Sequence, residues 1–294
     1  MSLLKGIYSA SMSVLNDNLT LNVEQTIKHA ENVIDEGSHG VAFFGSTGQA
    51  QLIPITEKIE LLNKLTKSKY KEKFIIGTGL NSLGDTINLM RVARSLNFSK
   101  FLIMPPAFYK YSDRDVINFY LKIIDAHPDC QIILYNFEKL CGYKFSVECV
   151  QELVKLFPEQ IIGVKDSSYN LFENLKIDNF SILPGSESKL LKGLELGCSG
   201  IITATCNVTS ALARKVYDDF VDKKEQTLNQ KLCDVRNIFE KYNLISGLHA
   251  YYSKKNIIYK NVLPPLSNLN SKEEKELMDN LEKLNFSTKS AMVA

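Results

Sequence analysis

Short apolar or β-branched runs alternate along this chain with segments that have the periodicity of amphipathic helices. Such alternation implies parallel strands joined by right-handed crossovers. Eight units in about 220 residues fit a closed (β/α)8, or TIM, barrel better than a doubly wound sheet, which would need some of the strands to be misassigned. The expected strands are GIYSASMSV (6–14), GVAFFG (40–45), FIIGTG (74–79), FLIMPP (101–106), QIILYN (131–136), IIGVKD (161–166), SILPGS (181–186) and GIITAT (200–205).

Helices are expected between these strands and after the last of them. The pair Ser112 and Asp115 marks one helix start. Beyond Thr209 the strand pattern stops, so the sequence predicts a barrel over residues 1–222 and a helical region over 223–294 that packs on it. The clearest helical segments are 20–36, 56–65, 85–96, 114–127, 147–157, 211–221, 225–242 and 272–284.

Composition excludes several classes of protein. With 35 basic and 33 acidic residues the net charge is +2, too balanced to favour nucleic acid or an acidic membrane surface. No apolar run approaches the ~18 residues of a membrane span, and the first ten residues lack a secretory core. Six cysteines without a CxxC pair suggest reduced thiols and a cytoplasmic protein. Four scattered histidines argue against a metal site.

The segment IIGVKDSS places a lone lysine, Lys165, at the end of a β-branched strand. An ammonium there loses hydration that nothing obvious replaces. Burial lowers the pKa of such an amine, and the neutral form can attack a ketone to give a protonated Schiff base that stabilises a neighbouring carbanion. The alternative is a lysine that extends to the rim or pairs with Asp166.

Tyr135 ends the preceding strand, QIILYN, and so lies beside Lys165 at the same mouth of the predicted barrel. In such barrels the chemistry sits at the C-terminal ends of the strands. A phenol near the imine could carry protons to and from the reacting oxygen. The alternative is a core tyrosine whose hydroxyl bonds to the backbone.

Two further loops follow strands at this mouth. GSTGQ (45–49) presents Ser46, Thr47 and free backbone N–H groups that can hold a carboxylate, although it can also be only a tight loop. PGSES (184–188) offers Gly185 and Glu187 to a polar substrate tail, or else Ser186 or Ser188 caps the next helix.

Together these segments resemble the dihydrodipicolinate synthase/N-acetylneuraminate lyase family of class I, Schiff-base-forming aldolases. The resemblance covers about the whole chain. Its specific elements, in order, are GSTGQA for the family's GTTGE-type loop, ILYN for its catalytic tyrosine, IIGVKDSS for its lysine and GCSGIITATCN for its strand-eight segment.

The resemblance implies a site that handles pyruvate. Lys165 would form the imine, and Tyr135 would act as acid and base. Ser46 and Thr47 would hold the carboxylate, Ser46 would also pass protons to Tyr135, and the backbone near Ile202 would line the site. Family members are commonly homotetramers, built as a dimer of dimers, and use no metal or dissociable organic cofactor.

One departure from the family concerns the substrate. Dihydrodipicolinate synthases carry an arginine shortly after the tyrosine, which grips the carboxylate of the aldehyde substrate, whereas this chain has Leu140 there. No arginine occurs between Arg114 and Arg214. Lys139 or Lys144 could approach, but an ammonium lacks the bidentate fork. This departure weighs against lysine biosynthesis.

Other departures are smaller. Many members donate a tyrosine across the dimer interface where this chain has Phe108, with Tyr109 next to it as a possible replacement. Gln49 replaces the usual loop glutamate, which we interpret as a structural change. Ala204 replaces the serine of sialate lyases, and together with PGSES it favours shorter sugar acids or related 2-oxo acids.

Three functional hypotheses follow. The first is a pyruvate-dependent lyase or aldolase acting on a 2-oxo acid, such as a 2-keto-3-deoxy sugar acid, through a Lys165 imine. The second is dihydrodipicolinate synthase itself, condensing pyruvate with aspartate semialdehyde. The third is a barrel that binds a 2-oxo acid without turning it over. Retention of both Lys165 and Tyr135 argues against the third, because neither is needed merely for binding.

Overall fold

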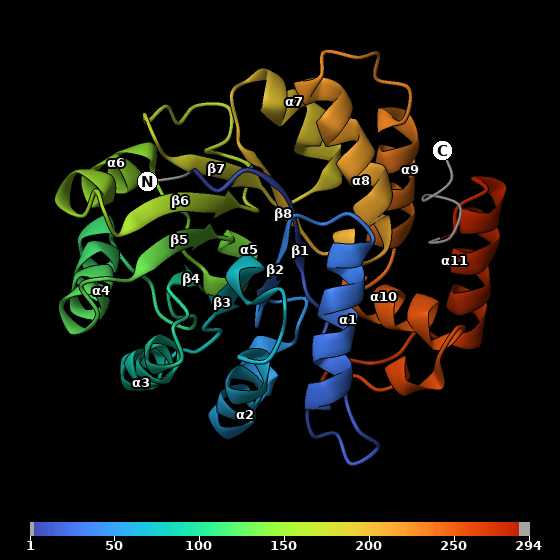
Figure 1. Cartoon of the computed structure of the whole chain (residues 1–294), viewed down its shortest axis with the longest axis horizontal. Helices are drawn as coiled ribbons and strands as arrows, with labels where there is room; N and C mark the ends of the chain where they lie inside the picture. Colours follow the sequence, from blue (N-terminus) through green and yellow to red (C-terminus); the bar gives the residue numbers. More distant parts are fainter. Residues whose placement is uncertain (1–2, 288–294) are drawn as a thin grey trace.

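The computed structural model describes residues 3–287, and its centre is a barrel of parallel strands (Figure 1). Neighbouring strands follow the order β7-β6-β5-β4-β3-β2-β1-β8, and every pair is parallel. The strands are β1 (Gly6–Ala10), β2 (Gly40–Phe43), β3 (Phe74–Gly77), β4 (Lys100–Ile103), β5 (Gln131–Asn136), β6 (Ile161–Asp166), β7 (Ser181–Pro184) and β8 (Gly200–Thr203).

The ring of strands closes between β7 and β8. The backbone N–H of Ser199, just before β8, donates to the carbonyl of Ile182 in β7 at 2.9 Å. Pairing of β1 with both β2 and β8 brings the first strand beside the last, so the sheet is a nearly closed (β/α)8 barrel. The predicted TIM barrel is thereby confirmed, and the doubly wound alternative is wrong.

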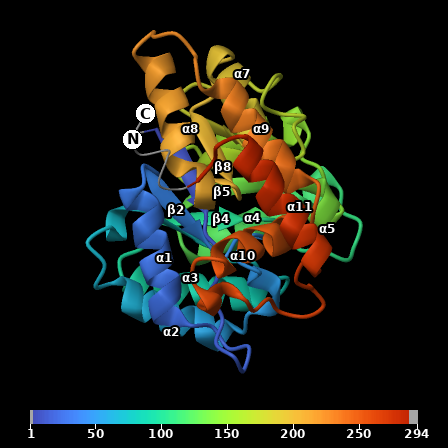
Figure 2. The same ribbon diagram turned by 90° about the vertical axis from the view of Figure 1, so that its right-hand side faces the viewer.

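Helices surround the barrel and continue after it (Figures 1 and 2). Within residues 3–287, no helix is both long and apolar enough to span a membrane. The helices are α1 (Val23–Asp35), α2 (Ile55–Leu65), α3 (Leu83–Ser95), α4 (Asp113–Ala126), α5 (Glu138–Cys141), α6 (Val147–Leu156), α7 (Leu190–Glu195), α8 (Cys206–Val221), α9 (Asn229–Glu240), α10 (Leu244–Ser253) and α11 (Ser271–Lys283).

Most of these elements match the sequence-based expectation, including the helix start at Ser112, which forms a capping box with Asp115. Strand β1 is shorter than expected and ends at Ala10, and α8 begins at Cys206, five residues earlier than expected. The sequence analysis missed α10 because this helix is apolar and buried over most of its circumference, so it lacks the amphipathic stripe that marks a surface helix.

Alternation along the strands divides the core into two parts. One set of side chains fills the barrel interior, and the other packs outward beneath the helices. Val164 belongs to the outer set, so Lys165, the next residue, points inward. The interior set contains Leu4, Tyr8, Ala10, Ala42, Ile75, Leu102, Ile133, Tyr135, Leu183 and Ile202.

The helices after α8 lie together along one side of the barrel, as the two views show. Leu232 and Phe239 of α9 and Leu277 of α11 share an apolar cluster with Ile7 of β1 and Leu212 of α8. The predicted C-terminal helices are therefore present and share a core with the barrel. The boundary at 222 stays a prediction, and positions 1–2 and 288–294 of the two predicted ranges lie outside the described residues.

A buried polar network fastens this C-terminal region to the barrel. His29 Nε2 donates to the side-chain carbonyl of Asn207 at 2.7 Å, and its Nδ1 accepts from the hydroxyl of Tyr259 at 3.1 Å. His249 Nδ1 donates to the Tyr259 carbonyl at 2.8 Å, and its Nε2 accepts from the Gln49 amide at 3.3 Å. Each imidazole therefore donates once and accepts once, as a neutral ring does. Burial lowers the pKa of both histidines to about 4.

This network predicts an acid-labile fold. Because the folded-state pKa values of His29 and His249 lie below the ordinary 6.5, the unfolded chain binds more protons between about pH 6.5 and pH 4. We expect the free energy of unfolding to fall by about 2 kcal/mol per histidine between pH 7 and pH 5. Urea denaturation across this pH range measures the loss. His29→Gln is expected to reduce the slope of the free energy of unfolding against pH, whereas His127→Gln, outside the network, is not. A free energy of unfolding that stays constant over this range would contradict the account.

Candidate active site

The strand register places Lys165 and Tyr135 side by side inside the barrel. They are directly paired residues of β6 and β5, and the Nζ atom of Lys165 lies 4.2 Å from the centroid of the Tyr135 ring. That is close enough for a cation–π contact. Both side chains are buried, with exposed fractions of 3% for Lys165 and 4% for Tyr135.

Lys165 has no counter-ion in the described part of the chain. Within residues 3–287 its ammonium makes no ion pair and no hydrogen bond. The neighbouring carboxylate of Asp166 is used elsewhere, because it accepts from the backbone N–H groups of Tyr169, Leu171 and Phe172 at 2.9–3.0 Å. The alternatives of a Lys165–Asp166 pair and of a lysine that extends to solvent are therefore wrong. The barrel holds an unpaired primary amine in a largely apolar interior.

The loop after β2 brings a hydroxyl to the tyrosine. The Oγ of Ser46 and the hydroxyl of Tyr135 are 3.0 Å apart, so the two can exchange a proton along a hydrogen bond. Thr47 is buried beside Ser46. The loop is held by Gln49, whose side-chain carbonyl accepts from the backbone N–H of Leu263 at 2.6 Å and whose amide contacts His249. These contacts support the structural role interpreted for Gln49.

A cavity of about 290 Å³ opens over these groups and collects several of the predicted site residues. One wall is the β2 loop, another is the ends of β5 and β6, and the remainder comes from the ends of β7 and β8 and from α9 and α10. The lining residues are Ser46, Thr47, Tyr135, Phe137, Leu140, Lys165, Ser167, Tyr169, Gly185, Ala204, Arg236, Asn243, Leu244 and Ile245.

Three predicted site residues lie elsewhere. The side chain of Ile202 is buried in the barrel interior, and the segment predicted to line the site with its backbone reaches the cavity two residues later, at Ala204. Tyr109 is 75% exposed on the loop after β4, next to Phe108, which is 93% exposed and has a positive φ of 87°. Within one chain neither aromatic ring enters the cavity.

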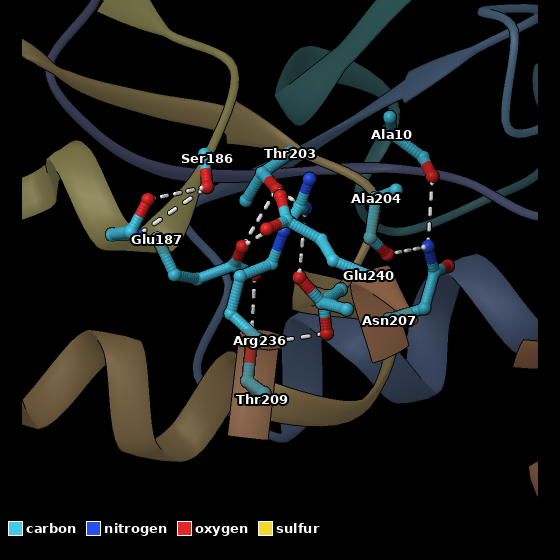
Figure 3. Close-up of polar contacts among 11 residues, drawn as sticks. Ala10, Ser186, Glu187, Thr203, Ala204, Asn207, Thr209, Arg236 and Glu240 are labelled. Carbon is cyan, nitrogen blue, oxygen red and sulfur yellow. Dashed lines mark hydrogen bonds and ion pairs between the residues drawn. The ribbon is translucent and has the colours of Figure 1, made fainter. Parts of the chain in front are cut away.

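Glu187 is the third. It is fully buried behind the cavity wall, where its carboxylate accepts from Thr203 Oγ1 at 2.8 Å, from Thr209 Oγ1 at 3.1 Å and from Arg236 Nη1 at 3.3 Å (Figure 3). Ser186, just before it, caps the short 3-10 helix η3 (Glu187–Lys189), which is the helix-cap alternative for this loop.

Arg236 was not predicted from the sequence. The family pattern has an arginine near the tyrosine strand, where this chain has none, but α9 carries one into the cavity from the C-terminal region. The sequence does contain one sign of this residue, a charged position on the buried stripe of α9 between Val235 and Phe239. Because a buried cation requires partners, such a position indicates a polar site nearby. The two lysines considered as substitutes do not line the cavity, and Lys144 pairs with Glu138 at 3.1 Å on the surface.

A second cavity, of about 270 Å³, adjoins the first and has a mostly apolar lining. The two share Ser46, Tyr135, Leu140 and Ile245. Leu140, which occupies the position expected for an arginine, therefore gives this side of the site an apolar surface. Among residues 3–287 no cluster of three or more His, Cys, Asp and Glu side chains is arranged to hold a metal ion.

Comparison with known proteins agrees with this geometry. The model of the dihydrodipicolinate synthetase family matches residues 3–284. A DapA-like lyase from Chloroflexus aurantiacus is 29% identical over 84% of this chain and 85% of its own length. A 2-dehydro-3-deoxy-D-gluconate/2-dehydro-3-deoxy-phosphogluconate aldolase from Picrophilus torridus is 26% identical over 76% of this chain and 85% of its own length.

Solved structures show the same fold. A dihydrodipicolinate synthase from Bacillus anthracis superposes with a TM-score of 0.87 at 22% identity, covering 96% of this chain and 99% of the other. YagE, a prophage protein of the dihydrodipicolinic acid synthase family from Escherichia coli K12 solved with pyruvate, gives a TM-score of 0.84 at 21% identity and covers 97% and 99%. The chain therefore belongs to the dihydrodipicolinate synthetase family and is a lyase of the class I aldolase type.

Proposed function

We propose that this enzyme binds pyruvate or another 2-oxo acid as an imine on Lys165 and uses it for reversible aldol cleavage of a 2-oxo acid such as a 2-keto-3-deoxy sugar acid. The observation that carries the proposal is the buried Lys165 amine, which has no counter-ion among residues 3–287 and lies 4.2 Å from the centroid of the Tyr135 ring. A lysine that has no structural partner, in a barrel lined by polar groups at its mouth, is available for covalent chemistry.

The chemistry follows from three groups. The Lys165 nitrogen adds to the ketone carbon, and the former carbonyl oxygen leaves as water once it has been protonated. Tyr135 supplies and recovers these protons, and Ser46 exchanges protons with it across their 3.0 Å contact. In cleavage, the electron pair of the C3–C4 bond moves into the iminium to give an enamine, while the C4 hydroxyl loses its proton to Tyr135 and becomes an aldehyde.

Carboxylate recognition is assigned to the β2 loop. Ser46 and Thr47 line the cavity with their hydroxyl groups, and the loop backbone is fixed by Gln49. A carboxylate held there places the adjacent ketone over the barrel axis, within reach of Lys165. In this proposal Glu187, Tyr109 and the side chain of Ile202 make no direct contact with the substrate of the same chain, whereas Gly185 lines the cavity.

Dihydrodipicolinate synthase activity is the second candidate, and the name of the matching family favours it. Its aldehyde substrate carries a carboxylate that needs a cationic partner, whereas Leu140 is apolar and Lys144 is paired with Glu138. A coupled assay with pyruvate and aspartate semialdehyde separates the two candidates. Turnover above the uncatalysed background would favour the synthase.

The exposed aromatic pair Phe108–Tyr109 supports a homo-oligomer, with a homotetramer as the proposed state. A bulky residue at positive φ costs about 1–3 kcal/mol and persists where its surroundings hold it. Burial of both rings against a second subunit would supply such surroundings. A cytoplasmic location is a further proposal, supported by six cysteines that are all free thiols.

Imine formation has a direct test. Incubation with pyruvate and borohydride is expected to add a reduced pyruvate adduct to the peptide that contains Lys165, detected by mass spectrometry. Lys165→Ala is expected to lose both the adduct and all aldolase turnover, whereas Lys144→Ala, a surface variant, is expected to keep both. A wild-type protein without an adduct on Lys165 would end the proposal, and adduct formation without turnover of any 2-oxo acid would favour a binding protein.

The assembly is tested by light scattering after size exclusion. We expect a mass close to four chains for the wild-type protein and a smaller mass for the double variant Phe108→Ser/Tyr109→Ser, because the variant removes two exposed apolar rings. Leu156→Ser changes a half-exposed apolar residue of α6 and serves as the control. A monomeric wild-type protein at micromolar concentration would contradict the oligomer.

A further inference from the structure

Arg236 lines the cavity beside the ends of β7 and β8. Its side chain is 7% exposed and reaches from α9 to the ends of β7 and β8. The Nη1 atom donates to Thr203 Oγ1 at 3.0 Å, to Thr205 Oγ1 at 3.1 Å and to Glu187 Oε2 at 3.3 Å, and Nε donates to Glu240 Oε1 at 2.8 Å (Figure 3).

One nitrogen of this guanidinium remains available. With Nε and Nη1 engaged, Nη2 makes no hydrogen bond to any residue between 3 and 287. A guanidinium offers five N–H donors in a fixed plane, so anchoring two nitrogens also fixes the direction of the third. Arg236 lines the cavity, so Nη2 is the nitrogen of this side chain whose N–H groups are left for a bound molecule.

The charge of Arg236 is already compensated. Two carboxylates contact its single guanidinium, one from fully buried Glu187 and one from half-exposed Glu240. An incoming phosphate or carboxylate would meet a hydrogen-bond donor but also two nearby like charges, and the cost of removing its hydration would not be repaid. A hydroxyl group loses little hydration and can accept from Nη2 without this repulsion.

A 2-oxo acid bound at Lys165 can place its tail, the carbons beyond the ketone, near Arg236. If the carboxylate lies on Ser46 and Thr47 and the ketone lies at Lys165 on β6, the remaining carbons can extend along the ends of β7 and β8, the strands that follow β6 around the barrel. Gly185, Ala204 and Arg236 line the same cavity there. The same end of the cavity carries the polar side chains of Ser167, Tyr169 and Asn243. Hydroxyl groups on the tail find partners here.

We propose that Arg236 is a specificity-determining residue whose neutralised guanidinium selects 2-oxo acids with an uncharged, hydroxylated tail and disfavours those with a phosphate or a second carboxylate at that end. The proposal rests on the proposed function, since it takes the ketone to lie at Lys165. Glu240 acts through Arg236 and sets its effective charge.

The test uses two acids that differ only in the charge of the tail, 2-dehydro-3-deoxy-D-gluconate and its 6-phosphate. Each is a 2-oxo acid, so borohydride labels Lys165 with either one, and the half-saturating concentration for labelling measures binding without requiring turnover. In the wild-type enzyme we expect the unphosphorylated acid to label at a concentration lower by about tenfold or more.

Two variants separate charge from hydrogen bonding. Glu240→Gln keeps an acceptor for Nε but removes one negative charge. It is expected to lower the ratio of the half-saturating concentration of the phosphate to that of the unphosphorylated acid by about tenfold. Arg236→Lys removes the planar fork and is expected to weaken the sugar acid relative to pyruvate. Asp218→Asn makes the same change at another arginine pair on a helix, Arg214–Asp218, and is expected to leave the ratio unchanged.

Labelling of Lys165 by pyruvate distinguishes a failure of the proposed function from a failure of the specificity inference. If pyruvate does not label Lys165, the proposed function fails. If pyruvate labels Lys165, imine chemistry stands, and three results would still overturn the specificity inference. The phosphate could label at the same concentration as the unphosphorylated acid, or neither sugar acid could label. Glu240→Gln could also leave the ratio of the two half-saturating concentrations unchanged.

Discussion

The site depends on one buried amine that lacks a counter-ion. An ammonium in an apolar interior is costly unless a carboxylate or several hydrogen bonds compensate for its lost hydration. Lys165 has neither within residues 3–287, only the face of the Tyr135 ring. Asp166, the nearest carboxylate in sequence, points to the other side of β6 and accepts hydrogen bonds from backbone N–H groups there. So poor a compensation of its charge supports the proposal that this amine serves through its reactivity.

The rest of the fold holds other groups around this amine. Barrel register sets the tyrosine beside it, and the β2 loop brings a serine to the tyrosine hydroxyl. That loop is in turn fastened to the C-terminal helices through Gln49 and His249. The same helices supply Arg236, which lines the cavity at the ends of β7 and β8. The C-terminal region therefore supports both ends of the proposed substrate, and its attachment through neutral histidines makes this support sensitive to acid.

The alternation of strands with helices along the sequence is sufficient to predict the barrel. Lys165 and Tyr135 end successive strands, and this position is sufficient to predict that they are adjacent. The capping box at Ser112 is a local signal. Contacts that depend on the packing of distant segments were not predictable. Arg236 was missed because only the folded chain brings α9 to the ends of β7 and β8, and Glu187 was assigned to substrate because its partner Arg236 lies 49 positions away. Helix α10 was missed because it is buried on most sides.

A crystal of the wild-type enzyme soaked with pyruvate, solved at a resolution that separates atoms of the ligand, examines the central claim most directly. The account predicts continuous electron density from the Nζ atom of Lys165 to the second carbon of pyruvate, with the carboxylate on the Ser46–Thr47 loop. Pyruvate bound without a covalent link, or a Lys165 ammonium turned to a carboxylate of the protein, would contradict it.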